Sequence, residues 1–77
     1  MLTYRTDLEH ANLLWAVAEE LNRLGHNALA LKLGKLSQSI GFGHKSVANG
    51  LEEIDEAIVV LGNHYMTKTL KKLVDEQ

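Results

Sequence analysis

The sequence predicts an all-α fold, a small three-helix bundle forming a single domain over residues 1–77. Three observations predict it. The chain contains no proline and is rich in Leu, Ala, Glu and Lys, the residues that favour helix by intrinsic propensity. Apolar residues recur at steps of three and four along three successive stretches, the period of an amphipathic helix. Seventy-seven residues also match the size of one domain.

The first helix is expected over residues 7–24. Thr6 and Glu9 have the spacing of a capping box, in which the Thr6 hydroxyl accepts a hydrogen bond from the Glu9 amide. Gly25 can adopt the positive φ that often ends a helix. The apolar stripe consists of Ala11, Leu14, Ala18 and Leu21, widened by Trp15 and Val17.

A second helix follows after a short turn, with Asn27 as its expected N-cap. Its apolar stripe consists of Leu29, Leu33, Leu36 and Ile40. Leu29, Leu31 and Leu33 also alternate with the period of a strand, but the helical spacing continues to Ile40 where the alternation fails. The helix is expected to end at the turn formed by residues 41–43, Gly-Phe-Gly.

The third apolar stripe is the longest and predicts either one long helix or several short ones. It consists first of Val47, Leu51, Ile54, Ile58, Leu61 and Tyr65, and then of Met66, Leu70 and Leu73. The stripe shifts by one residue close to Gly62 and Asn63, which are common at helix ends. The spacing alone leaves both alternatives open.

Residues 57–61 are apolar all round the helix, which requires cover on two sides. A domain of this size buries only about 60% of its unfolded surface, so few helices are left to supply that cover. We therefore expect a homo-oligomer, with a dimer favoured. Its interface is expected at Ile58, Val59, Val60 and Tyr65. The alternative is a central helix that is buried on both sides within one chain.

The net charge of −2 is unevenly distributed along the sequence. Residues 21–51 carry four basic side chains and no acidic one, whereas residues 1–20 and 52–77 each carry a net charge of −3. Such a basic segment is typical of a face for nucleic acid or for an acidic partner. The alternative is that its charges pair with the acidic flanks in the folded chain.

Catalytic, metal and membrane functions have no support in the sequence. The chain has no cysteine, and its four histidines are 16, 18 and 20 residues apart, so none is paired at the spacing of helical metal ligands. No nucleophile or phosphate-loop motif is present. We expect no enzyme activity, no cofactor, no metal and no membrane span, and the lack of a signal-peptide pattern predicts a cytoplasmic protein.

Residues 36–51 resemble a helix-turn-helix motif. Ser37 supplies the small residue of the first helix, Ile40 precedes the turn glycine, and Val47 and Leu51 supply apolar anchors. The acidic run over residues 52–56 argues against DNA, because it would repel phosphate. The alternative is two bundle helices joined by a turn, with Phe42 closing the end of the core.

Two functions are compatible with these features. The first is a small non-enzymatic regulatory or inhibitory module that acts by protein–protein contact, with a basic face for an acidic partner. The second is a dimeric helix-turn-helix protein whose outward side chains contact the bases and phosphates of DNA. The candidate partner- or nucleic-acid-binding residues are Lys32, Lys35, His44, Lys45 and Asn49. A pocket for a small anionic ligand between helices remains a third alternative.

Overall fold

The computed structural model describes the backbone of residues 3–77 and the side chains of residues 8–77. Within that range every secondary-structure element is a helix, which confirms the predicted all-α class, but there are four α-helices instead of three. The elements are α1 (Thr3–Arg23), α2 (Asn27–Gly41), the short 3-10 helix η1 (Val47–Gly50), α3 (Leu51–Leu61) and α4 (Tyr65–Asp75).

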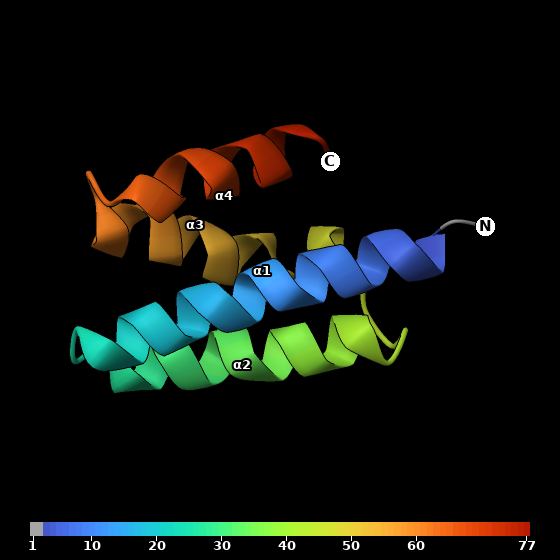
Figure 1. Cartoon of the computed structure of the whole chain (residues 1–77), viewed down its shortest axis with the longest axis horizontal. Helices are drawn as coiled ribbons and strands as arrows, with labels where there is room; N and C mark the ends of the chain where they lie inside the picture. The colour runs from blue at the N-terminus through green and yellow to red at the C-terminus, as the bar shows by residue number, and fades with distance from the viewer. Residues whose placement is uncertain (1–2) are drawn as a thin grey trace.

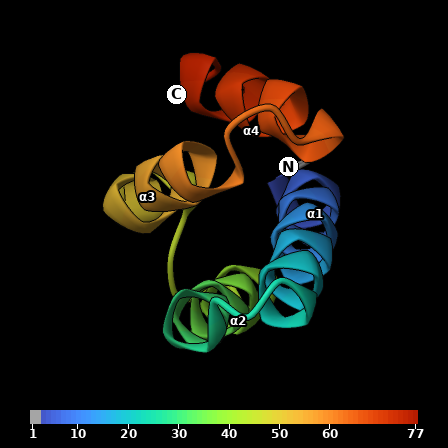
Figure 2. The same cartoon turned by 90° about the vertical axis from the view of Figure 1, so that its left-hand side faces the viewer.

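The four helices form two hairpins that share one interior. Helices α1 and α2 lie side by side along the longest dimension of the molecule, which measures 36 × 22 × 17 Å (Figure 1). Seen end-on, the helices surround the interior in the order α1, α2, α3, α4 (Figure 2). Helices α3 and α4 therefore cover one side of the α1–α2 pair and leave its other side open.

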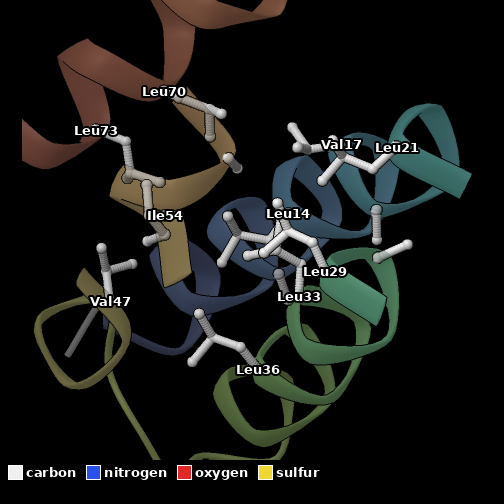
Figure 3. Packing of buried hydrophobic residues seen from close by; sticks show 14 of the residues in the cluster. Leu14, Val17, Leu21, Leu29, Leu33, Leu36, Val47, Ile54, Leu70 and Leu73 are labelled. Atoms are coloured by element: carbon white, nitrogen blue, oxygen red, sulfur yellow. The ribbon is translucent and has the colours of Figure 1, made fainter. Parts of the chain in front are cut away.

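The core is built from the predicted apolar stripes, and each helix contributes to it. Figure 3 shows side chains from both hairpins directed into this common interior. The largest fully buried side chains are Leu14, Leu21, Leu33, Ile40, Ile54 and Leu70. Two side chains assigned to the stripes are exposed instead: Trp15 on α1 and Tyr65 on α4. Each is adjacent in sequence to a residue that faces inward. Successive residues of a helix are about 100° apart around its axis, so a side chain one position away can face solvent.

The predicted start of the first helix is wrong, whereas its end is confirmed. Helix α1 begins at Thr3, so Thr6 lies inside the helix and cannot provide the non-helical backbone of an N-cap. Its side chain lies outside the described side chains. No glycine or proline stands between residues 3 and 7 to stop the helix. At the other end Gly25 has the expected positive φ of 95°, and the His26 amide donates to the Leu21 carbonyl at 2.9 Å.

Helix α2 has the predicted helical form and the predicted end. Its N-cap residue is His26 and not Asn27, since the Ala30 amide donates to the His26 carbonyl at 2.9 Å and Asn27 is already the first helical residue. The Asn27 side chain donates a hydrogen bond to the Asn22 side chain across the turn. After Gly41 the chain turns outward, and Phe42 is 76% exposed. Phe42 therefore does not close the end of the core.

The long third stripe is divided over η1, α3 and α4, so of the two alternatives the one of several short helices is present. The break occurs at Gly62, whose φ of 59° is positive, and the Gly62 amide donates to the Ile58 carbonyl at 3.0 Å. Helix α4 then starts at Tyr65, and its N-cap is His64, whose Nδ1 accepts a hydrogen bond from the Met66 amide at 3.1 Å. The shift in the stripe corresponds to this reversal of the chain.

Gly50 permits a close approach between the start of α3 and helix α2. Its backbone has a negative φ of −123°, so conformational freedom does not require glycine here. A Cβ atom at this position would lie 3.0 Å from Leu36 Cγ and closer still to both Leu36 Cδ atoms. Leu36 is itself buried, so it has little room to yield.

We expect Gly50→Ala to lower the free energy of unfolding by about 1–3 kcal/mol, because it overpacks the core. Gly34→Ala is the matched control. A Cβ at Gly34 would lie 3.7 Å from the Trp15 ring, which is an ordinary contact. Gly34→Ala should therefore raise the free energy of unfolding by about 0.5–1 kcal/mol, because alanine favours the helix over glycine. Urea unfolding followed by circular dichroism measures both, and equal effects of the two substitutions would contradict the packing argument.

Candidate functional site

All three predicted lysines line one small hollow beside α2. Lys32 and Lys35 lie on one face of the helix, and Lys45 comes from the loop after it. We call this feature the basic hollow; it has a volume of about 190 Å³ and is lined by Lys32, Lys35, Leu36, Ser39, Lys45 and Glu53. The loop is held back on α2 because the amides of His44 and Lys45 both donate to the Ser39 carbonyl, at 2.8 and 3.2 Å. This bend places Lys45 beside the lysines of α2.

The positive charge of the basic segment is only partly neutralised within the chain. Arg23 pairs with Glu20 on the same helix. Lys32 Nζ lies 3.9 Å from Glu56 Oε1, and both side chains are more than half exposed, so this pair adds little stability. Lys35 and Lys45 form no ion pair with the described side chains. Among the described side chains, the alternative in which the basic segment pairs with its acidic flanks therefore holds for Arg23 and Lys32 and not for Lys35 and Lys45.

His44 and Asn49 do not line the basic hollow. The His44 ring is exposed, with its centroid 6.2 Å from that of Phe42. The Asn49 side-chain oxygen accepts hydrogen bonds from the Ser46 amide at 2.9 Å and from the Ser46 hydroxyl at 3.1 Å. The acceptor group of Asn49 thus stabilises its own turn.

The segment that resembles a helix-turn-helix has a different arrangement of its second helix. Residues 44–46 are loop, Val47–Gly50 is a single 3-10 turn, and α3 starts only at Leu51. The first turn of α3 carries Glu52 and Glu53, where a recognition helix would approach DNA. Ser37 lies in the core and donates a hydrogen bond to the Ala11 carbonyl at 2.7 Å, which explains a small polar residue at that position.

A second hollow, which the sequence did not predict, runs between α1 and α2. We call it the α1–α2 groove; it has a volume of about 340 Å³, and its lining includes Trp15, Glu19, Leu31, Gly34 and Lys35. Trp15 is 46% exposed and Leu31 is 62% exposed. The one available signal was Leu31, a large apolar residue of α2 that stands outside the stripe of buried leucines. Trp15 gave no such signal, because it adjoins the core stripe of α1.

The predicted oligomer surface is partly exposed. Val59 is 79% exposed and Tyr65 is 77% exposed, whereas Val60 is 36% exposed. Ile58 is partly buried and packs against the core. The apolar run of α3 is therefore not covered on both sides by the described chain, and the alternative of a fully buried central helix is wrong.

A cluster of charged side chains joins the end of α1 to the start of α4. His64 Nε2 lies 2.8 Å from Glu20 Oε2, and both side chains are partly buried. Arg23 Nε donates to Glu20 Oε1 at 3.0 Å. Because His64 Nδ1 accepts from the Met66 amide, Nε2 carries the proton that is donated to Glu20. Both ring nitrogens are engaged, so the cluster serves as a structural link between the hairpins.

Hydrogen bonds from Arg23, and then from His64, lower the pKa of Glu20 from its usual 4.5 to about 2. Between these values the unfolded chain binds the proton more readily than the folded chain. The stabilisation is therefore complete above about pH 4.5 and is lost as the pH falls towards 2.

We expect Glu20→Gln to remove the part of the acid sensitivity that arises in this window. Stability measured by urea unfolding at a series of pH values should decline less steeply from pH 4.5 to 2 in this variant than in the wild type. Glu19→Gln removes the neighbouring carboxylate, which has no ion pair with Arg23 or His64, and should keep the wild-type dependence. Identical pH profiles for Glu20→Gln and the wild type would contradict the link.

Other chemical signals are absent from the part of the chain that the structure describes. No three His, Asp or Glu side chains of residues 8–77 are grouped in a way that could hold a metal ion. None of the described helices is long and apolar enough to cross a membrane. No protein-family model, curated protein or solved structure matches the chain significantly.

Proposed function

We propose that the chain is a small non-enzymatic regulatory or inhibitory module that acts by protein–protein contact, and that the basic hollow receives carboxylates of an acidic partner. The observation that carries this proposal is the pair Lys35 and Lys45. They converge on one hollow and have no ion-pair partner among the described side chains. Unpaired ammonium groups at one place steer an acidic surface into contact and fix its position.

A protein suits this hollow better than DNA. Glu53 lines the hollow beside the lysines, and Glu52 and Glu53 form the first turn of α3. A phosphate backbone is uniformly negative and would be repelled by these carboxylates. A protein surface can instead place single carboxylates at the lysines and neutral or basic groups near Glu53.

Self-association through α3 and the start of α4 is the second part of the proposal. Val59 and Tyr65 expose most of their surface, and neither lines the basic hollow. Exposed apolar side chains of this kind favour contact with a second copy of the same surface, as in a two-fold dimer. Val60 and Ile58 lie beside them on α3 and would complete the contact.

Capture from an extract of the native cell, with and without nuclease, tests the partner. We expect the immobilised chain to retain a protein of acidic surface whether or not nuclease is present. Lys35→Glu combined with Lys45→Glu should abolish retention, because the reversed charges repel carboxylates. Lys68→Glu combined with Lys72→Glu is the matched control: it reverses two exposed lysines of α4 and should leave retention unchanged.

Two results of the same experiment would overturn the proposal. If nuclease releases the retained protein, nucleic acid is the bound species. If both pairs of reversed lysines weaken retention equally, the interaction depends on overall charge and not on the basic hollow.

Val59→Lys tests the oligomer. Since the side chain is 79% exposed, we expect unchanged helicity by circular dichroism and a shift from dimer to monomer by light scattering. Lys35→Glu is the control: this exposed lysine lies on α2 and lines the basic hollow, away from Val59 and Tyr65, and the variant should remain dimeric. A wild-type chain that is already monomeric, or a Val59→Lys variant that stays dimeric, would show that this surface does not mediate self-association.

A further inference from the structure

We infer that the α1–α2 groove docks an amphipathic helix of the partner, with the apolar face of that helix in the groove and its acidic edge above Lys35. This inference rests on the proposed function, because the helix belongs to the same acidic partner. It adds the form and the side-chain chemistry of the segment that is recognised.

The apolar lining of the α1–α2 groove supports the docking of an apolar helix face. Trp15 and Leu31 are the large side chains of its lining, and they remain 46% and 62% exposed in the described chain. Gly34 belongs to the same lining and has no side chain, and a Cβ atom at this position would lie 3.7 Å from the Trp15 ring. An exposed indole beside a backbone recess is typical of the anchor points where most of the binding energy of a protein interface is concentrated.

The dimensions of the groove suit a helix. Its lining extends over residues 15–22 on α1 and residues 30–38 on α2, which corresponds to about 12 Å along each helix. That length accepts two turns of a third helix lying between α1 and α2. The partner would present apolar side chains at positions i, i+3 or i+4, and i+7 to fill it.

Charge decides which edge of the docked helix is acidic. Lys35 lines both the α1–α2 groove and the basic hollow, so the apolar recess continues directly into the lysine cluster. Glu19 lies on the α1 side of the groove and repels carboxylates there. A docked helix is therefore oriented with its acidic edge towards α2, where carboxylates reach Lys35 and then Lys45.

Trp15 provides a direct probe, because it is the only tryptophan of the chain. The ligand is a synthetic helical peptide of about 16 residues, enough for four turns, with Leu at the apolar positions and Glu along one edge. One control peptide replaces each Glu by Lys, and another replaces each Leu by Gln. We expect only the Leu–Glu peptide to shift the Trp15 emission to shorter wavelength in a saturable way.

Two variants test the contacts that determine binding. Lys35→Glu and Leu31→Gln should each raise the Kd of the Leu–Glu peptide by about tenfold. Lys68→Glu, an exposed lysine of α4, should leave the Kd unchanged. Circular dichroism of each variant verifies that the helices are retained.

The other outcomes overturn the inference in distinguishable ways. Binding of the Leu–Glu and Gln–Glu peptides with equal affinity and no change in Trp15 emission would leave the basic hollow as the binding site and exclude the groove. An equal Kd for the Leu–Glu peptide and for the control with Lys in place of Glu would show that charge does not determine which helix the groove binds. Absence of any peptide binding, together with Trp15 emission that depends on the concentration of the chain alone, would assign the groove to a second copy. In each case the capture experiment still decides the proposed function separately.

Discussion

One shared core determines which surfaces of this chain are left for binding. Leu14, Leu33, Ile54 and Leu70 come from the four helices and are completely buried against one another's elements. Helices α3 and α4 both pack on the inner side of the α1–α2 pair, so no further helix of the described chain covers its outer side (Figure 2). The apolar groove on that side is therefore a consequence of how the core is closed.

The position of the second hairpin depends on two contacts between elements distant in sequence. Gly50 allows the start of α3 to approach Leu36 of α2 more closely than any other residue would. The hydrogen bond between Glu20 and His64 joins α1 to the start of α4. The first contact brings α3 against α2, and Glu53 consequently borders the lysines of the basic hollow. The second contact holds the start of α4 against α1.

The sequence predicts the elements better than the surfaces. Helical spacing identifies the buried stripes, and the positive φ of Gly25 and Gly62 agrees with helix ends inferred from glycine chemistry. The spacing of apolar residues does not determine how wide the buried stripe of a helix is. It therefore does not distinguish the partly exposed Trp15 from the buried residues beside it. Lys32 and Lys35 share a face by helical period alone, whereas the approach of Lys45 depends on a loop hydrogen bond to Ser39 that no local pattern predicts.

Quenching of Trp15 fluorescence by acrylamide shows whether the outer side of the α1–α2 pair is open in the free chain. With the indole 46% exposed, we predict quenching at about half the efficiency seen for the unfolded chain in urea, unchanged on dilution and unchanged in Val59→Lys. If acrylamide does not quench the Trp15 emission of the free, dilute chain, the α1–α2 groove is already closed and cannot receive a partner.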